Sequence, residues 1–255
     1  MKKIFVLFLL ATFSIKAQTW QLEAIKLKEG SEKEYLETEK FWEKVKKLAV
    51  EESKLGAWYV FKNITKVEEG KDRRYDYFVC NFYQDEAQMN SNVDMLDLAM
   101  RAHKGKLSKS KIRYNFQNWD SARKYTNTYS LERLDRTINI VPVSKNTPIY
   151  LYPMAQKNDE YENLEMKFAK KSHEIDILDY RKAYWAFDKV IDRSENANKE
   201  ITHFTFEKYT SDNLPKSRRS NWDEMEYEER LMWDMALKSR KAFPRIQLEF
   251  VMSSE

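Results

Sequence analysis

The chain has 255 residues, of which 34% are charged, 42% hydrophobic and 14% aromatic, with only 4 glycines and 5 prolines. This composition excludes an intrinsically disordered chain, in which aromatic residues are scarce and Pro, Gly and Ser are abundant. The formal net charge is +4, and removal of an N-terminal leader carrying Lys2, Lys3 and Lys16 subtracts three and leaves +1. Such a weak basic excess argues against nucleic-acid binding, which needs many cationic side chains on one surface.

The N-terminus has the pattern of a secretory signal peptide. Two lysines precede an apolar run over residues 4–13, and a cleavage zone ends at Ala17 or Gln18. The run is about half of the roughly 20 apolar residues that a membrane-spanning helix needs, and no comparable run follows it. We therefore predict that residues 1–18 are removed and that the mature protein is periplasmic or secreted, without membrane association after cleavage.

A strand, a helix and a hairpin are expected in the first third of the chain. Residues 20–27 mix apolar and polar positions as a strand does. Ser31 and Glu34 form the capping box that starts a helix. Its apolar stripe consists of Tyr35, Trp42, Val45, Leu48 and Ala49. Residues 57–64 and 74–83 are rich in aromatic and β-branched residues around a polar turn, which predicts a β-hairpin.

A first unit is predicted over residues 19–144. Residues 84–136 are polar and helical in pattern, and residues 137–143 (TINIVPV) are expected to form its last strand. The order strand, helix, strand, strand, helix, strand is the ferredoxin-like arrangement. The long connection before the last strand predicts a helical insertion near residues 89–118. Its basic run, residues 104–113, is interpreted as a solvated surface rather than a patch for an anionic partner.

The same order returns in residues 145–255, which we predict to be a second ferredoxin-like unit. With an offset of 126 residues Tyr35 matches Tyr161, and with an offset of 127 Phe41 matches Phe168. The expected elements are strands at 148–154, 183–191, 201–209 and 247–252, a helix with the stripe Tyr161, Leu164, Phe168, Ile175 and Leu178, and a second helix opening at Asn221 and Glu224. Order and pattern together predict an internal duplication.

Several short motifs mark the helix entries and strand ends of both units. They are Glu34-Tyr35, Glu160-Tyr161, Phe41-Trp42, Leu55-Gly56-Ala57-Trp58, Tyr75-Asp76-Tyr77 and Asn81-Phe82-Tyr83. In these motifs the chain resembles the dimeric α+β barrel superfamily, and within it the NIPSNAP-like and related secreted bacterial proteins. The resemblance covers most of the mature chain.

This resemblance implies an α+β fold in which two tandem ferredoxin-like units pack their antiparallel sheets into an intramolecular barrel. Relatives in the superfamily include haem-degrading and antibiotic monooxygenases, muconolactone isomerases and chlorite dismutases. The Asn, Trp and His set of the haem-degrading group has no position-by-position match in this sequence. No catalytic residue is therefore carried over.

Strand alternation indicates which side chains share a sheet face. Tyr77 and Asn81 share one face of the first hairpin, and His203 and Glu207 share the corresponding face of the second. Since helices pack on the more apolar face, we expect this polar face to point into the barrel. There the four residues, together with Glu249, would surround a ligand cavity.

His173 is a further candidate ligand-binding residue, because it lies opposite Lys46 in the repeat and off the apolar stripe. Cys80 is interpreted as a small packed hydrophobe. Three histidines without the i, i+4 spacing and a single cysteine predict no metal site. The sequence has no phosphate loop, dinucleotide fingerprint or nucleophile elbow, so we predict no cofactor and name no catalytic residue.

The leading hypothesis is an exported protein, monomer or homodimer, that binds a small ligand in a cavity between the two sheets. One alternative is a small-molecule enzyme, oxygenase-like or isomerase-like, that uses the face of His203 and Glu207. Another is a non-catalytic scaffold that acts through its helical surfaces and its insertion. Fold analogy alone is a weak basis for choosing among them, so the sequence leaves enzymatic activity open.

Overall fold

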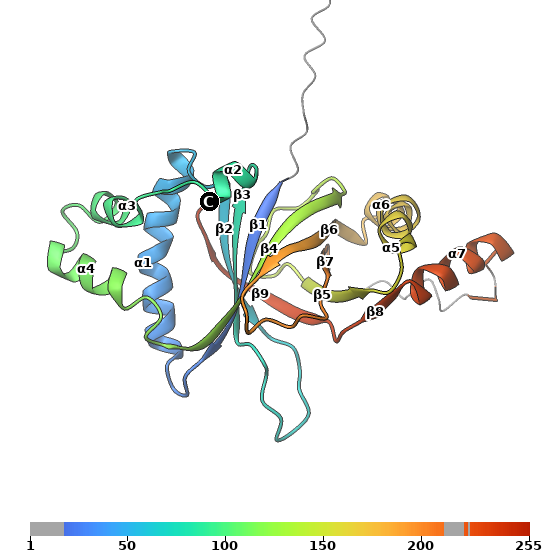
Figure 1. The fold of residues 1–255 in the computed structure, drawn as a ribbon, viewed down its shortest axis with the longest axis horizontal. Coiled ribbons are helices and arrows are strands. Elements are labelled where there is room, and N and C mark those ends of the chain that lie inside the picture. The colour runs from blue at the N-terminus through green and yellow to red at the C-terminus, as the bar shows by residue number, and fades with distance from the viewer. Residues whose placement is uncertain (1–17, 212–221, 224) are drawn as a thin grey trace, which may run out of the picture.

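The computed structural model describes residues 18–211, 222–223 and 225–255 (Figure 1). Apart from Gln18, the predicted signal peptide lies outside these residues, and so do Asn221 and Glu224, at which a helix of the second unit was predicted to begin. Within the described ranges, no helix is both long and apolar enough to cross a membrane.

The first unit begins with a strand, a long helix and two strands, and three short helices precede its last strand. Its elements are β1 (Thr19–Leu27), α1 (Glu32–Glu51), β2 (Ala57–Asn63), β3 (Tyr77–Tyr83), α2 (Glu86–Met89), α3 (Met95–Ala102), α4 (Lys109–Gln117) and β4 (Arg123–Arg136). Ser31 is the N-cap of α1, but its hydroxyl makes no capping bond. Glu34 instead accepts a hydrogen bond from Ser121 Oγ at 2.6 Å, so the expected capping box does not form.

The second unit repeats this order with a broken first helix and a broken last strand. Its elements are β5 (Ile149–Gln156), α5 (Glu160–Leu164), the π-helix η1 (Glu165–Ala169), α6 (Lys170–Leu178), β6 (Lys182–Arg193), β7 (His203–Tyr209), α7 (Tyr227–Lys238), β8 (Arg240–Ala242) and β9 (Ile246–Ser253). In each unit a strand, a helix, two strands, further helix and a final strand follow one another, as the sequence predicts.

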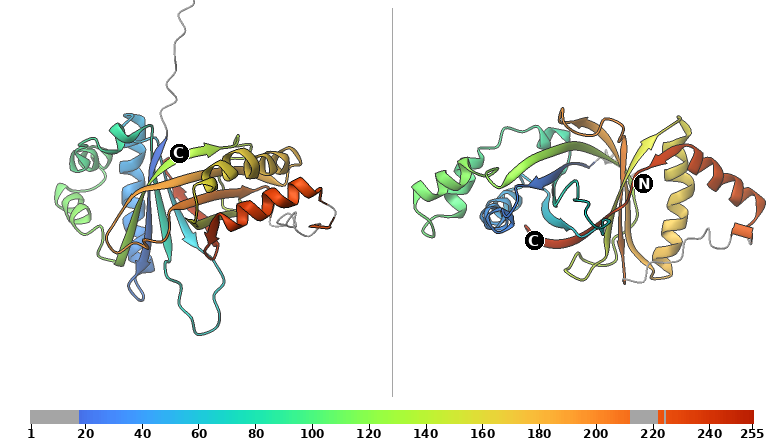
Figure 2. Two further views of the ribbon diagram at one scale, coloured as in Figure 1. Left: turned by 45° about the vertical axis from the view of Figure 1, so that its right-hand side comes forward. Right: turned by 90° about the horizontal axis from the view of Figure 1, so that it is seen from below.

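The strands form a closed antiparallel barrel. Hydrogen-bonded neighbours run β7-β6-β4-β1-β3-β2-β9-β5, and β5 pairs with β7 to close the circle of eight, while β8 adds to β5. The two units meet at two seams, where β4 pairs with β6 and β2 pairs with β9. Helices α1 to α4 lie on one side of the barrel and α5 to α7 on the opposite side (Figure 2). The predicted fold class is confirmed.

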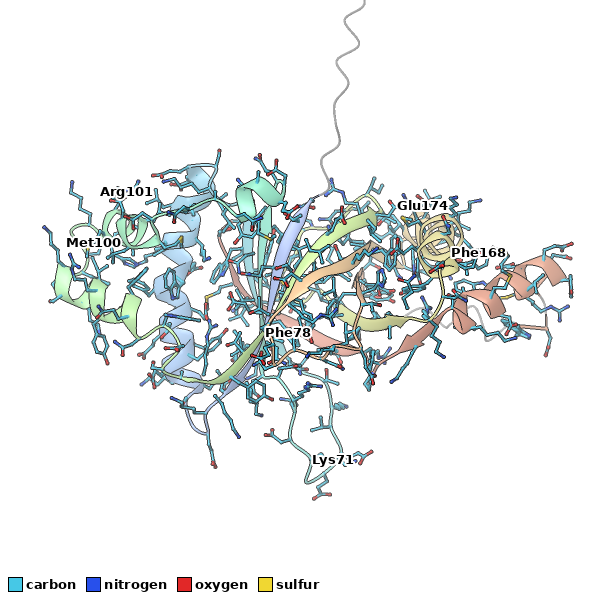
Figure 3. All side chains as sticks on the ribbon, viewed as in Figure 1. Lys71, Phe78, Met100, Arg101, Phe168 and Glu174 are labelled. Atoms are coloured by element: carbon cyan, nitrogen blue, oxygen red, sulfur yellow. The ribbon has the colours of Figure 1, made fainter. Side chains whose placement is uncertain are left out.

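The barrel interior is filled by apolar side chains from both units. Phe78 and Leu131 of the first unit share one buried cluster with Phe204 and Leu248 of the second, and Phe78 lies among the strands at the centre of the molecule (Figure 3). A separate cluster packs α1 against the outer face of the first sheet, and it includes Tyr77. The expected orientation of the faces is therefore reversed, because the enclosed barrel takes the more apolar face.

The last strand of the first unit was expected at residues 137–143, and this prediction is wrong. The strand is β4, over residues 123–136, whose Tyr129 and Leu131 are buried at alternate positions. The charged and polar residues of this segment give its sequence the pattern of a polar helix. They are compatible with a strand because β4 pairs on both sides, with β1 and β6.

The apolar stripe predicted for the second unit's first helix fails in its last two positions. Ile175 is 43% exposed and Leu178 is 81% exposed. A π-helical turn widens the i to i+4 pattern to i to i+5 and adds one residue. Because η1 precedes α6, the buried positions of α6 become Ser172 and Ile177 instead.

A buried ion pair joins the two units at the seam between β4 and β6. Asp188 is fully buried and accepts a hydrogen bond from Arg133 Nε at 2.6 Å and another from Trp20 Nε1 at 2.8 Å. Arg133 faces Asp188 directly across the two strands. Burial raises the pKa of Asp188, and the Arg133 guanidinium opposes this effect.

Replacing Asp188 by alanine should destabilise the protein by about 3–5 kcal/mol, because it leaves a buried guanidinium without its partner. Urea unfolding at neutral pH measures the difference. The control is Asp179→Ala, which removes one exposed carboxylate paired with Arg181 and should cost less than about 1 kcal/mol. Equal effects of the two substitutions would show that the seam does not depend on Asp188.

Candidate functional site

A cleft of about 430 Å³ lies between α1 and the outer face of the first unit's sheet. Strands β1, β2 and β3 form its floor and α1 one wall, and residues from α3, α4 and the start of β4 complete it. The lining residues are Glu23, Glu39, Trp42, Lys46, Trp58, Val79, Asn81, Met95, Phe116, Gln117, Trp119 and Arg123. We call it the first cleft.

A network of charged and amide side chains lines the first cleft. Arg123 donates from Nη1 to Glu23 at 2.7 Å and from Nη2 to Glu39 at 2.9 Å. Asn81 donates to Glu23 at 3.3 Å and accepts from Lys46 Nζ at 2.8 Å. One guanidinium and one ammonium thus balance two carboxylates, and the amide of Asn81 links the two halves of the network.

Burial shifts the ionisation of this network. It raises the pKa of Glu39, although Arg123 acts in the opposite direction. It lowers the pKa of Lys46, against the attraction of the two carboxylates. Perturbed acids and bases that line a cleft are a common feature of functional sites, although structural ion pairs also produce them.

Local structure explains why these side chains meet. Glu39 and Lys46 are seven residues apart on α1, close to two helical turns, so both point at the sheet. Asn81 on β3 pairs with Trp58 on β2, and Glu23 lies on the adjacent strand β1. Side chains at such positions share a sheet face and lie within reach of one another.

Apolar side chains, most of them aromatic, form much of the rest of the first cleft, and one of the aromatic ones, Phe116, lies on an inserted helix. Phe116 lies on α4, and its ring centroid is 5.7 Å from that of Trp42. The guanidinium of Arg123 lies 4.6 Å from the ring centroid of Trp119. The helices within the predicted insertion therefore supply a wall of the cleft as well as exposed surface.

The second unit has a corresponding cleft of about 240 Å³ between its helices and its sheet. Arg240 and Glu165 form an ion pair there, at the positions that Arg123 and Glu39 occupy in the first unit. Each arginine also lies near a tyrosine ring, 5.7 Å from Tyr35 in the first unit. The arginine and glutamate pair is thus common to both units, whereas the other polar residues differ.

Lys182 lies at the centre of the second cleft. Its Nζ is 2.7 Å from His173 Nδ1 and 2.7 Å from Glu207 Oε2, and Tyr209 donates to the same carboxylate. Burial alone would raise the pKa of Glu207, but the Lys182 ammonium lowers it. The structure therefore brings two of the sequence-predicted residues, His173 and Glu207, together around a lysine that was not predicted.

The other predicted site residues lie apart. Asn81 lines the first cleft, whereas Tyr77 donates to Glu32 at 2.6 Å, at the start of α1. His203 is fully buried against the ring of Phe187, and Glu249 is exposed on β9. The six residues do not enclose one cavity between the sheets, and their ligand-binding roles stay predictions.

Sequence reasoning missed the residues that make the first cleft distinctive. Glu39 and Lys46 carried a usable signal, because a spacing of seven places them on the same helix face as the apolar stripe. Arg123 carried no such signal, because it lies 84 residues from its partner Glu39. It also belongs to β4, whose sequence has the pattern of a polar helix.

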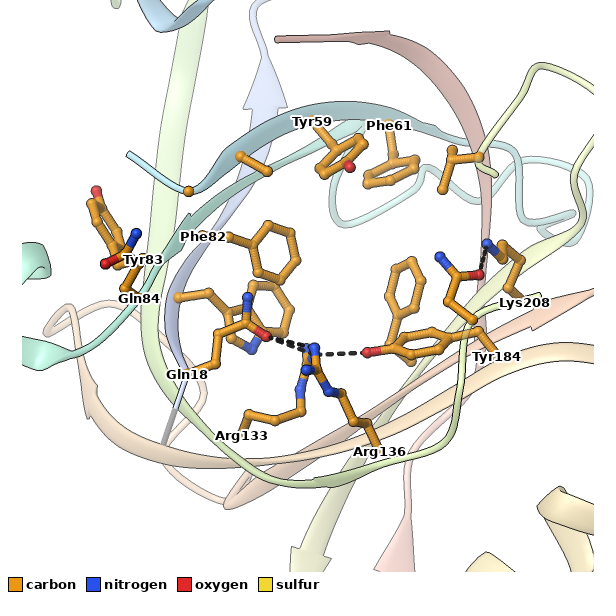
Figure 4. A pocket seen from close by; sticks show the side chains of 16 residues that line it. Gln18, Tyr59, Phe61, Phe82, Tyr83, Gln84, Arg133, Arg136, Tyr184 and Lys208 are labelled. Atoms are coloured by element: carbon orange, nitrogen blue, oxygen red, sulfur yellow. Dashed lines mark hydrogen bonds between the residues drawn. The ribbon is translucent and has the colours of Figure 1, made fainter. Parts of the chain in front are cut away.

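A third cavity, of about 250 Å³, lies at one mouth of the barrel and is lined from both units (Figure 4). Aromatic rings and cationic side chains face each other across it. Figure 4 shows Tyr59 and Phe61 on one side and Arg133, Arg136 and Tyr184 on the opposite side. This cavity lies between the two sheets, where a ligand was predicted, but its lining consists of other residues.

The comparisons with known proteins concern the fold. A protein of Lactobacillus acidophilus NCFM assigned as a monooxygenase is 12% identical, with a TM-score of 0.55 over 94% of this chain and 95% of its own. An anthrone oxidase-like protein is 8% identical, with a TM-score of 0.50 over 93% and 92% of the two chains. The fold is that of the dimeric α+β barrels. No protein-family model and no curated protein sequence matches the chain.

The burial of His203 predicts a pH dependence of stability. Burial lowers the pKa of His203 from 6.5 to about 4, so between these values the unfolded chain binds a proton that the folded chain does not. The contribution of His203 to stability is complete above pH 6.5 and is lost as the pH falls toward 4, by about 3 kcal/mol. Urea unfolding at pH 7 and at pH 4.5 measures it.

The comparison variant is His203→Gln, which removes the titrating group and leaves the other acidic and basic groups in place. The wild-type protein should lose more stability than this variant over the same pH interval. Equal losses in the two proteins would show that His203 does not cause the pH dependence.

Proposed function

We propose that the protein is a small-molecule enzyme of the oxygenase type that holds an aromatic substrate in the first cleft. The observation that carries this proposal is the buried network of Glu23, Glu39, Lys46 and Arg123 facing a wall of tryptophan rings. Apolar pockets with a few convergent polar groups and shifted pKa values are the usual form of an enzyme site.

The arrangement suits the removal of a proton from an activated aromatic substrate. Tryptophan rings would hold a planar substrate by stacking. Glu23, whose side chain is 20% exposed against 2% for Glu39, is the member of the carboxylate pair that reaches the cleft and would accept the proton. Burial raises the pKa of the neighbouring Glu39, and proton transfer to a positioned carboxylate is a common form of general-base catalysis.

The reaction class is the oxidation of a methylene group flanked by aromatic rings. Glu23 would take one proton from the carbon, and the resonance-stabilised anion would transfer electrons to O₂ and combine with it to give a peroxide anion. Return of the proton from Glu23 to this anion gives a hydroperoxide. Loss of water from the hydroperoxide leaves a ketone, so that the substrate and one O₂ give the ketone and one H₂O. Lys46 and Asn81 would stabilise the anion by charge and hydrogen bonding.

The names of the two structural neighbours agree with this class, but a shared fold is an analogy and not a demonstration of activity. Binding without turnover and a purely structural role are the competing proposals. A closer relation to the NIPSNAP-like proteins likewise stays a prediction.

The proposal predicts oxygen consumption with polycyclic substrates of the anthrone type and formation of one ketone per O₂. The Glu23→Gln variant should lose at least about 100-fold in kcat, as expected when a general base is removed. An oxygen electrode and mass spectrometry of the product measure the two quantities.

Glu37→Gln provides the matched control, because Glu37 is exposed on the opposite side of α1 and its variant should retain full activity. Binding of the substrates without oxygen uptake would contradict the enzyme proposal and favour a binding protein. Turnover that Glu23→Gln leaves unchanged would remove Glu23 from the site.

We also propose that the protein is exported, on the pattern of residues 1–18. Expressed with its own N-terminus in a bacterium, the chain recovered from the periplasm or medium should begin at Gln18 or Thr19. Intact mass measurement distinguishes this product from the full chain. Recovery of a chain that retains its N-terminal segment in the cytoplasm alone would contradict the export proposal.

A further inference from the structure

We infer that the barrel mouth shown in Figure 4 is a second ligand site, which binds a small planar aromatic carboxylate. This cavity lies inside the barrel, whereas the first cleft lies on the outer face of the same sheet. The inference therefore goes beyond the proposed oxygenase function and stands on different residues.

Aromatic side chains from both units form the walls of the barrel mouth. Trp20 and Phe82 stack with ring centroids 5.0 Å apart. Tyr59 and Phe61 lie parallel at 6.1 Å, and Phe61 lies 6.1 Å from Phe206 of the second unit. Flat rings on several sides of a cavity of about 250 Å³ suit one small planar molecule, since ligand pockets of this size hold little more.

Three cationic side chains line the same cavity, and they are not equivalent. Arg133 is neutralised by Asp188 at 2.6 Å. Arg136 is exposed at the rim and lies 3.4 Å from Gln18 Oε1. Lys208 is 1% exposed and donates to Asn139 Oδ1 and to the carbonyl of Val141. Two positive charges therefore remain without a neutralising carboxylate among the described lining residues.

The buried ammonium of Lys208 is the decisive group. Lysine is almost never fully buried without a charged partner, and removing a charge from water is costly unless it is paired. Within the described part of the chain, the hydrogen-bond partners of Lys208 Nζ are two neutral oxygens, Asn139 Oδ1 and the carbonyl of Val141, and no carboxylate forms an ion pair with it. Burial lowers the pKa of Lys208 to about 8, and the Glu255 carboxylate, which is not bonded to it, opposes this effect only in part.

A ligand carboxylate would supply the missing negative charge, and its ring would occupy the aromatic part of the cavity. Lys208 and Arg136 both line this cavity and lie at different places on its wall in Figure 4, across from Tyr59. Besides Asp188, the carboxylate of Glu255 contacts the lining, where it accepts a hydrogen bond from Tyr59 at 2.6 Å and remains exposed. It occupies the rim and leaves the aromatic interior open to a ligand.

Isothermal titration with 2-naphthoate and with uncharged 2-naphthamide tests the inference. The acid should bind, and the amide should bind at least about tenfold more weakly, because a charge-assisted hydrogen bond is the stronger kind. Lys208→Met and Arg136→Gln should each weaken naphthoate binding by at least about tenfold. Lys189→Met, which removes a lysine paired with Glu162 on the outer side of the barrel, should leave the affinity unchanged.

Thermal unfolding of each variant confirms that the fold is retained, and Lys208→Met is expected to fold because it replaces a buried charge by an apolar side chain of similar length. Arg136 is at the surface, so the Arg136→Gln variant is expected to fold and still tests the inference if Lys208→Met does not fold. Equal affinities for acid and amide would overturn the inference. So would naphthoate binding that is lost in Lys46→Met but kept in Lys208→Met and Arg136→Gln, since the ligand would then occupy the first cleft.

Discussion

Closure of the barrel is the constraint on which the rest of the molecule depends. Two four-stranded sheets can close only if both seams, β4 with β6 and β2 with β9, form together, because open strand edges leave backbone groups unpaired. Closure places one face of every strand in an enclosed interior and the other under helices. The interior must then be filled with large apolar side chains, so charged groups concentrate between helices and sheet or at the mouths.

Internal duplication separates the structural residues from those that differ in chemistry. Both units keep an arginine and glutamate pair that ties the first helix to the sheet, Arg123 with Glu39 and Arg240 with Glu165. Around this common pair the first unit places an amide and a lysine, and the second places a histidine and a second carboxylate. The ion pair that is present in both units therefore indicates a role in folding. The polar residues that differ between the units indicate where ligands or reactions can differ.

The order of elements and the duplication could be predicted from sequence, because periodicity and turn residues are local signals. Alternation showed that Tyr77 and Asn81 share a face, but it could not show which face is enclosed. That choice depends on the partner unit. Arg123 was missed for a related reason, since its strand resembles a polar helix until β1 and β6 pair with it. Cavities that require long-range pairing, such as the barrel mouth, have no local signal at all.

The π-helical turn of the second unit also accounts for a change in spacing between the two units. The offset between the two copies is 126 residues at Glu39 and Glu165 and 127 at Phe41 and Phe168, and η1 spans this point. The second unit therefore has one more residue than the first in this part of the helix, and the wider turn accommodates it without displacing a strand. Such a turn changes which side chain, Lys46 or His173, reaches a cleft while both halves of the barrel remain matched.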